Sequence, residues 1–228
     1  MCGRFSLFTP AGDLAERFDA TPTRAFEPRY NVAPGDDVAV IRNDAPAVID
    51  ELEWGLIPHW VEDPDDWSKP INARGETVAE KPSFRDAFDR RRCLVLADGF
   101  YEWQERPRGP KQPYRVVLGE DDPFAMAGLW EEWSSNDDVR RTVTIVTTDA
   151  NDLMAPIHDR MPVVLAPDEE DRWLAADDPG ELQGLLDPYD GEDMHAHPVS
   201  TAVNDPSNDR PGVVEPVDDP QSGLGDFA

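Results

Sequence analysis

The chain has 228 residues, which is enough for one domain with a sizeable core. A hydrophobic content of 39% with seven tryptophans excludes a disordered acidic tail. The formal net charge of −27 argues against a nucleic-acid partner, because phosphate binding needs Lys and Arg. However, abundant Asp with almost no Lys is typical of cytosolic proteins from salt-loving organisms, in which salt screens the repulsion between acidic side chains. We therefore expect the total charge to reflect a halophilic habitat rather than the partner.

The acidic charge is unevenly distributed along the chain. Residues 1–118 carry 16 basic and 21 acidic side chains, a net charge of −5. Residues 119–228 carry 5 basic and 27 acidic side chains, a net charge of −22. The first part of the chain is therefore the place to look for an anion-binding surface.

Short strands and a few short helices alternate along the chain. Thr9 is placed to cap the first helix, and Asp98-Gly99 predicts a bulge in the longest apolar strand. In chain order, strands are expected at residues 2–8, 38–42, 48–55, 93–103, 114–118, 125–130, 142–148, 194–200 and 213–217, and one further strand ends in the Pro34-Gly35 turn. Helices are expected at residues 10–18, 83–91, 168–175 and 181–186, and a polar loop at residues 61–70.

These elements predict a single α+β domain over residues 1–217. Curved, mostly antiparallel sheets form a barrel-like core, and the short helices flank it. Residues 218–228 are expected to be a flexible C-terminal tail. No apolar run approaches the roughly 18 residues of a membrane span, and the N-terminus lacks the apolar region of a signal peptide. We therefore expect a cytoplasmic protein.

The two cysteines, Cys2 and Cys93, provide no disulfide framework, and we expect free thiols in a reducing cytosol. The sequence also lacks the GxGxxG, Walker, HExxH and CxxC patterns, so no cofactor and no metal is predicted.

Cys2 stands out by its position. If Met1 is removed, Cys2 carries an α-amine and a thiol on adjacent carbons. An α-amine has a pKa near 7.7–8.0, so roughly a tenth is uncharged at neutral pH and can attack an aldehyde. The thiol can then add to the imine and close a five-membered thiazolidine. Two alternatives remain at this point: Cys2 as an ordinary strand residue, and the N-terminal nucleophile of a glutamine amidotransferase.

Further motifs decide between these alternatives. In chain order they are Met1-Cys2-Gly3-Arg4-Phe5, Tyr30-Asn31-Val32-Ala33-Pro34-Gly35, Trp54-Gly55-Leu56-Ile57-Pro58, Ile71-Asn72-Ala73-Arg74-Gly75-Glu76-Thr77, Asp98-Gly99-Phe100-Tyr101-Glu102-Trp103, Ile157-His158-Asp159-Arg160-Met161-Pro162 and His197-Pro198-Val199-Ser200. This ordered set resembles the SRAP family of abasic-site processing proteins, once named SOS-response-associated peptidases, over about residues 2–217. The later motifs do not belong to amidotransferases.

The resemblance implies an activity and four catalytic residues. Family members form a thiazolidine between the N-terminal cysteine, here Cys2, and the ring-opened aldehyde of an abasic site in single-stranded DNA. His158 matches the histidine that opens the sugar ring by acid–base catalysis. Glu102 matches the glutamate near the amine, where a carboxylate moves protons and steadies an iminium. Asn72 matches the asparagine that orients the nucleophile and the sugar.

The resemblance also implies DNA contacts. Arg4, Arg74 and Arg160 each lie within two residues of a proposed catalytic residue and are expected to hold backbone phosphates. Trp60, Trp103 and Pro34 resemble positions that stack on bases or wedge between them. Trp54 and Trp130 are expected to be core residues, and the run Arg90-Arg91-Arg92 to complement a helix end or to extend the DNA path.

The tail contains a separate signal. Gln221, Leu224 and Phe227 fit the Gln-x-x-Leu-x-x-Phe pattern of a peptide that binds the replication sliding clamp, although Ala228 replaces the second aromatic. The predicted protein is thus a monomeric, nucleoid-associated DNA-repair enzyme with a neutral-to-basic groove around Cys2. Two rival functions remain: a cysteine peptidase acting on itself or on other proteins, with lyase chemistry also open, and a non-covalent single-strand-binding module recruited by the clamp.

Overall fold

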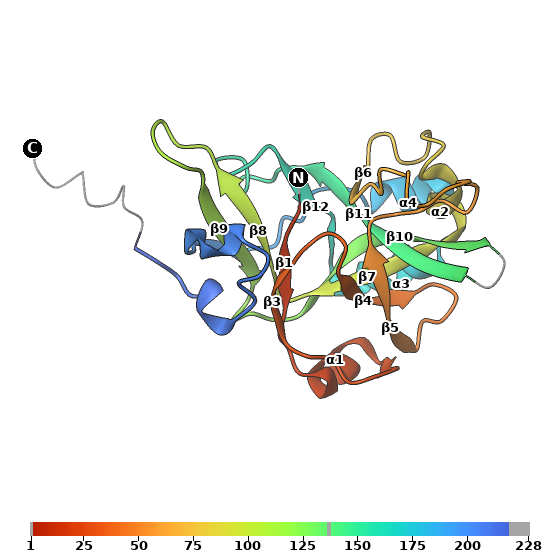
Figure 1. Cartoon of the computed structure of the whole chain (residues 1–228), viewed down its shortest axis with the longest axis horizontal. Helices are drawn as coiled ribbons and strands as arrows, with labels where there is room; N and C mark the ends of the chain where they lie inside the picture. The colour runs from red at the N-terminus through yellow and green to blue at the C-terminus, as the bar shows by residue number, and fades with distance from the viewer. Residues whose placement is uncertain (1, 136–137, 219–228) are drawn as a thin grey trace, which may run out of the picture.

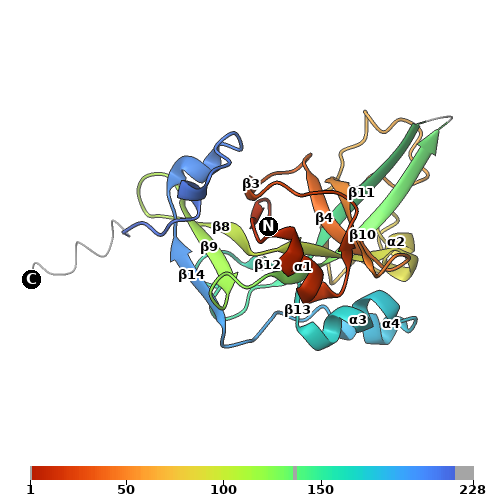
Figure 2. The ribbon, with the colours of Figure 1, turned by 90° about the horizontal axis from the view of Figure 1, so that it is seen from below.

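The structure is a computed structural model that describes residues 2–135 and 138–218. Its strands are β1 (Phe5–Leu7), β2 (Thr21–Pro22), β3 (Arg29–Val32), β4 (Asp37–Arg42), β5 (Val48–Trp54), β6 (Asn72–Arg74), β7 (Arg92–Ala97), β8 (Gly99–Gln104), β9 (Gln112–Leu118), β10 (Phe124–Ser135), β11 (Asp138–Asp149), β12 (Arg160–Pro162), β13 (Val164–Leu165) and β14 (Met194–Pro198). Its helices are α1 (Ala11–Phe18), α2 (Arg85–Arg90), α3 (Pro167–Ala175), α4 (Pro179–Gly184) and the 3₁₀ turns η1 (Thr201–Asn204) and η2 (Pro211–Val213). The strands form two sheets (Figure 1), and α3 and α4 lie side by side beneath the larger one (Figure 2).

Five strands of the larger sheet close into a ring. Neighbours pair antiparallel in the order β5, β4, β7, β10 and β11. The ring closes where β5 pairs in parallel with β11, with Val143 opposite Trp54. A ring with an odd number of strands cannot alternate its direction at every step, so one parallel contact is required. The predicted α+β domain with a barrel-like core of mostly antiparallel strands is thereby confirmed.

In the smaller sheet the first strand of the chain, β1, is not an edge strand. Its five strands run in the order β14, β9, β8, β1 and β3, and all of these pairings are antiparallel. Phe5 of β1 lies opposite Phe100 of β8 on one side and Val32 of β3 on the other. Because β1 is paired on both sides, the backbone just before it is held in place.

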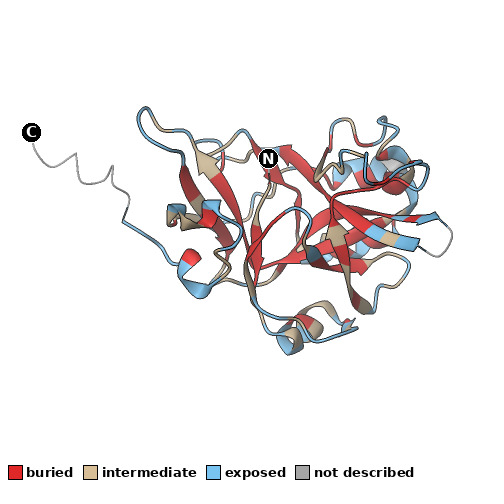
Figure 3. Ribbon diagram, in the orientation of Figure 1, coloured by how far each residue is buried: buried red, intermediate tan, exposed pale blue. Residues whose placement is uncertain are grey.

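Two hydrophobic cores lie on opposite sides of the larger sheet. All six residues of β7 are buried, and successive side chains of a strand point to opposite faces. Val95 joins a core that includes Phe5 of the smaller sheet. Leu94 joins a second core that includes Trp173 of α3. Figure 3 shows the resulting band of buried strands through the centre of the molecule.

The expectation of a single bulged strand over residues 93–103 is wrong. β7 belongs to the larger sheet and β8 to the smaller one, and Asp98 lies at the joint. The Asp98 carboxylate accepts hydrogen bonds from the backbone N–H groups of Phe8 (2.5 Å) and Thr9 (3.0 Å) and from Ser6 Oγ (2.7 Å), and it pairs with the Arg115 guanidinium (3.3 Å). Because the apolar run over residues 93–103 is buried in both sheets, its sequence pattern does not show where the chain leaves one sheet and enters the other.

Two smaller expectations are also wrong. Thr9 does not cap α1, which begins at Ala11, because the Thr9 hydroxyl donates instead to Asp98 at 3.1 Å. Residues 213–217 do not form a strand: η2 ends at Val213, and an isolated bridge between Val199 and Pro216 follows. The strands predicted at residues 38–42 and 48–55 and the four predicted helices are confirmed with shifted ends, and the two strands pair antiparallel as β4 and β5.

Within the described residues, no helix combines the length and the apolar character that crossing a bilayer requires. The predicted clamp-binding residues Gln221, Leu224 and Phe227 lie outside the described residues, and their role stays a prediction.

The joint between the sheets generates a stability prediction. A Cβ at Gly99 would lie 2.6 Å from Nε of Arg115, a fully buried side chain that its bonds to Asp98 and Ser6 hold in place. Gly99→Ala is therefore expected to lower the free energy of unfolding by about 1–3 kcal/mol or more.

Gly12 offers the matched control. It lies in α1, and a Cβ added there would have no atom within 4 Å, so Gly12→Ala is expected to raise stability by up to about 1 kcal/mol. Urea denaturation of both variants checks the pair, and equal midpoints would contradict this description of the joint.

Candidate active site around Cys2

Cys2 is buried immediately before β1. Its thiol is fully shielded from solvent and donates a weak hydrogen bond to the Arg4 carbonyl at 3.9 Å. Burial, reinforced by the negative charge of Glu102, raises the pKa of this thiol well above its ordinary value. Because the thiolate is the strong nucleophile of a cysteine, the thiol is unsuited to attack first. The Cys2 nitrogen is an amide in the chain that includes Met1, and it becomes an amine only when Met1 is removed.

Asn72 connects the two sheets at Cys2. It begins β6, which pairs in parallel with β11 of the larger sheet. Its side-chain Nδ2 donates to the backbone carbonyl of Cys2 at 2.8 Å. Its Oδ1 is buried and has no hydrogen-bond partner among residues 2–135 and 138–218. An amide oriented in this way has an acceptor left for a group that arrives beside Cys2.

Glu102 approaches Cys2 through the pairing of β8 with β1. Phe100 lies opposite Phe5, and the Tyr101 N–H donates to the Arg4 carbonyl at 2.9 Å, so the next residue along β8 comes alongside the segment that precedes β1. The Glu102 residue is 2% exposed. Burial raises the pKa of its carboxyl, and an electrostatic interaction with His158 partly opposes this effect. A carboxyl with a raised pKa can both accept and donate a proton near neutral pH.

His158 comes from the segment between β11 and β12. Its Nδ1 lies 3.0 Å from the backbone N–H of Arg160 and 3.0 Å from Oδ1 of Asp159. The first contact needs Nδ1 as an acceptor and the second needs it as a donor. The Arg160 backbone is fixed in β12, whereas the Asp159 side chain is 88% exposed. We therefore assign the neutral ring its proton on Nε2.

His158 and Glu102 line the same cleft. Its volume is about 500 Å³, and its other lining residues are Trp103, Lys111 and Asn204. Lys111 and Asn204 are not among the residues predicted from the sequence. Lys111 lies in the connection between β8 and β9, and Asn204 lies in η1, where Trp103 Nε1 donates to its Oδ1 at 2.7 Å. Neither position has a local motif that marks it, and only the fold brings them beside Glu102.

The three predicted arginines differ in their surroundings. Arg74 is exposed and lies two residues after Asn72 on β6, hence on the same face of that strand. Arg4 is half-buried and donates to the Val203 carbonyl at 2.7 Å and to Oδ1 of Asn31 at 2.9 Å. Arg4 thereby ties the start of β1 to η1.

Arg160 lies mostly inside the protein. Its guanidinium pairs with the carboxylates of Glu76 and Asp149 and donates to the Thr147 carbonyl at 2.8 Å. These contacts connect β12 to β11 and to the segment that follows β6. They hold in place the two segments that carry His158 and Asn72.

The predicted aromatic residues and Pro34 also differ in exposure and in their position relative to the cleft. Pro34 is exposed in the turn after β3, and Trp103 lines the cleft. Trp60 is 47% exposed and stacks edge-on against Trp67, with ring centroids 5.4 Å apart, but it does not line the cleft. Trp54 and Trp130 are buried, which confirms the expectation that they are core residues.

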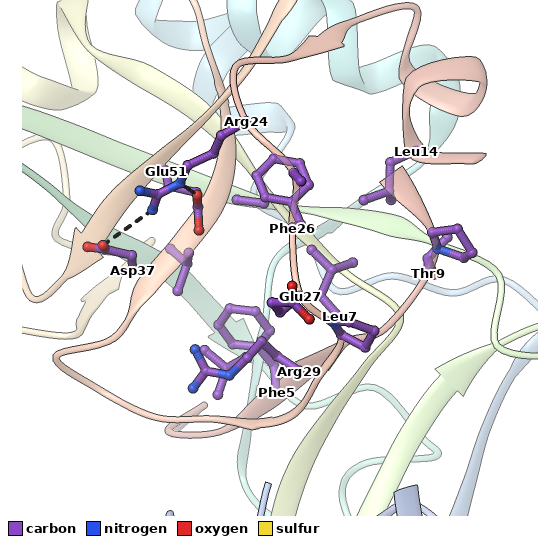
Figure 4. Close-up of a pocket in the computed structure, with 16 residues that line it drawn as sticks. Phe5, Leu7, Thr9, Leu14, Arg24, Phe26, Glu27, Arg29, Asp37 and Glu51 are labelled. Atoms are coloured by element: carbon purple, nitrogen blue, oxygen red, sulfur yellow. Dashed lines mark hydrogen bonds and ion pairs between the residues drawn. The ribbon is translucent and has the colours of Figure 1, made fainter. Parts of the chain in front are cut away.

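A second cavity lies away from these residues. It is formed around β1, α1 and the segment before β3, with Phe5, Leu7 and Phe26 among its apolar walls, and Arg24 at its edge pairs with Glu51 and Asp37 (Figure 4). None of the predicted site residues lines it. Within the described part of the chain, no cluster of three or more His, Cys, Asp or Glu residues could hold a metal ion.

Comparisons with known proteins identify the family of this chain. The sequence profile of the family described as "SOS response associated peptidase (SRAP)" matches residues 1–206. The chain belongs to the SRAP family. Its relatives in bacteria and vertebrates share the name of abasic site processing proteins.

Individual relatives cover nearly the whole chain. The abasic site processing protein YoqW of Bacillus subtilis (strain 168) is 45% identical over 222 residues, covering 94% of this chain and 99% of the relative. The abasic site processing protein YedK of Escherichia coli (strain K12) is 31% identical, covering 95% and 100%. A crystal structure of a protein from Bacteroides thetaiotaomicron, 29% identical, superimposes with a TM-score of 0.85 and covers 95% of this chain and 100% of that one.

The burial of both thiols generates a prediction about reactivity. Cys2 and Cys93 are free and buried, and burial raises the pKa of each thiol. We expect a thiol-specific reagent at neutral pH to label the folded protein at least about 100-fold more slowly than the unfolded chain. Rapid labelling of Cys2 in the folded protein would contradict the buried, protonated thiol.

The same pKa shifts have a consequence for stability. The unfolded chain ionises its thiols above their ordinary pKa, whereas the folded chain does not. The thiols therefore favour the folded state fully below that pKa, and this contribution shrinks as the pH rises above it.

Proposed function

We propose that this SRAP protein processes abasic sites in single-stranded DNA and that Cys2, after removal of Met1, forms a covalent thiazolidine with the abasic aldehyde. The observation that carries the proposal is that Asn72 bonds to the Cys2 carbonyl while Glu102 lies close enough for its charge to raise the pKa of the Cys2 thiol. The names of the relatives support the abasic site as substrate. The geometry supports the N-terminal residue as the point of attachment.

The reaction proceeds in two additions. The Cys2 amine adds to C1′ of the ring-opened sugar, and loss of water leaves an imine. The thiol then adds to the imine carbon while its proton moves to the nitrogen, which closes the five-membered ring. The aldehyde oxygen leaves as water, and no oxidant or reductant is needed. The raised pKa of the Cys2 thiol is consistent with this order, because the amine attacks first.

Each neighbouring residue has a role in this sequence. His158 opens the closed sugar, because a ring whose Nδ1 accepts a backbone hydrogen bond presents a proton on Nε2. Glu102 transfers protons as the amine attacks and as water leaves, and its carboxylate steadies the iminium. Asn72 holds the Cys2 carbonyl through Nδ2 and offers Oδ1 to the amine or to a sugar hydroxyl.

The DNA contacts divide into direct and supporting residues. Arg74 is exposed beside Asn72 and is assigned to a phosphate, while Pro34 and Trp103 are assigned to flanking bases. Arg4 and Arg160 make internal hydrogen bonds and ion pairs that position the site. Trp60 packs edge-on against Trp67 outside the cleft and is assigned to a base farther along the strand.

The proposal predicts an adduct that depends on the N-terminal aminothiol. Incubation with abasic single-stranded DNA is expected to give a heat-stable protein–DNA band on a denaturing gel. Cys2→Ala, or a tag that keeps the amine in a peptide bond, is expected to abolish the band. Cys93→Ala, which removes the other buried thiol, is the control and is expected to retain it. A protein–DNA band that persists in Cys2→Ala would exclude the thiazolidine mechanism. Cleavage of a protein substrate without a protein–DNA band would favour the cysteine peptidase.

Glu102 gives the reaction a characteristic pH dependence. Its carboxylate is the active form, and burial raises its pKa, so the adduct rate is expected to rise with pH through an inflection above the ordinary range of Glu. Glu102→Gln is expected to slow adduct formation by roughly 10²-fold and to remove that inflection. The increase in rate that remains comes from deprotonation of the Cys2 α-amine. Single-turnover rates measured across pH check this, and an unchanged profile in the variant would exclude proton transfer by Glu102.

A further inference from the structure

Lys111 is a cation of the cleft that the proposed chemistry leaves without a role. It lies in the connection between β8 and β9 and lines the cleft together with Glu102, Trp103 and His158. It also lines the adjoining hollow formed by Pro156 and its neighbours up to Asp159. Lys111 therefore lines both of the hollows to which His158 belongs.

The charge of Lys111 is available to a ligand. Its ammonium pairs with Glu105, and these two side chains are 53% and 78% exposed. An exposed ion pair of this kind contributes little to stability and is easily exchanged. Arg160, in contrast, is held by two carboxylates and a carbonyl with a side chain only 10% exposed. Replacing Glu105 at Lys111 with another anion thus costs much less free energy than breaking the ion pairs of Arg160.

Lys111 and Arg74 lie on opposite sides of the reacting residue. The sheet order places β8 and β9 on one side of β1, and Figure 1 shows their connecting loop extending beyond that side. On the other side, Asn72 of β6 bonds to the Cys2 carbonyl, and Arg74 follows on the same strand. A single strand with its abasic sugar at Cys2 would therefore have β6 on one side and the β8–β9 loop on the other.

We propose that Lys111 binds a backbone phosphate of the strand that flanks the abasic site, on the side opposite to Arg74. This inference rests on the proposed function, and it names the second anchor of the same substrate. An ammonium acts as a compact point charge with three rotatable donors, so it suits a phosphate whose orientation varies in a flexible single strand. Trp103 beside it provides a surface on which the adjoining base stacks.

The test measures reversible binding rather than adduct formation. The probe is single-stranded DNA that carries a tetrahydrofuran abasic analogue, which has no aldehyde and cannot react with Cys2. Binding of the full chain is measured over a series of salt concentrations. Lys111→Gln is expected to weaken binding several-fold at moderate salt and to reduce the slope of log K against log salt by about 0.7, the value for one phosphate contact on a single strand. Lys111→Arg is expected to retain most of the slope.

Arg141→Gln is the matched control. Arg141 also forms a surface ion pair, with Glu132, and the two side chains are 46% and 44% exposed. The variant loses the same unit of positive charge, but from the β10–β11 hairpin. Its slope is expected to equal that of the native chain. An equal loss of slope in both variants would show an effect of net charge and overturn the assignment to Lys111.

The remaining outcomes separate this inference from the proposed function. An unchanged slope in Lys111→Gln, with the native chain still forming an adduct on true abasic DNA, overturns the phosphate contact and leaves the function standing. A reduced slope together with no adduct from the native chain supports the contact while the covalent function fails. A loss of adduct in Lys111→Gln without any change of slope would place the amine at the aldehyde, which also overturns the phosphate contact.

Discussion

The hydrogen bond from Asn72 to the Cys2 carbonyl is the contact on which the site depends. It joins β6, which belongs to the larger sheet, to the residue that precedes β1 of the smaller one. β1 is itself held between β8 and β3, and the Asp98 carboxylate fixes its far end through the backbone of Phe8 and Thr9. A chain terminus is ordinarily poorly ordered, so these contacts explain how a residue next to the start of the chain is held in a defined position, as the proposed role of Cys2 requires.

Charge acts locally in this protein, and the total of −27 says little about the site. Arg160 is matched by Glu76 and Asp149 inside the protein, and Arg4 by carbonyl and amide oxygens. Arg74 on β6 and Lys111 in the loop after β8, in contrast, are exposed. Counting arginines near the motifs therefore overstates the charge that is free for DNA, while the fold adds a lysine that no motif marks.

The sequence predicts the fold class and most of the strands, because period-2 burial is a local signal. It does not predict that the apolar run over residues 93–103 crosses between sheets, since nearly every residue of the run is buried on both sides of the crossing. It also fails at Thr9, where a buried carboxylate distant in sequence competes for the hydroxyl. Lys111 and Asn204 are missed for the same reason, because their role depends on neighbours that are distant in sequence. The remaining site assignments rest on chemistry and resemblance.

The central claim is that the terminal amine and thiol of Cys2 together capture the aldehyde. Peptide mapping by mass spectrometry, after reaction with abasic single-stranded DNA and digestion of both protein and DNA, tests it most directly. We expect the modified peptide to begin at Cys2, without Met1, and to carry the abasic sugar phosphate with the loss of one water. A modified peptide that retains Met1, or a modification on Cys93 or Lys111 in place of Cys2, would contradict the account.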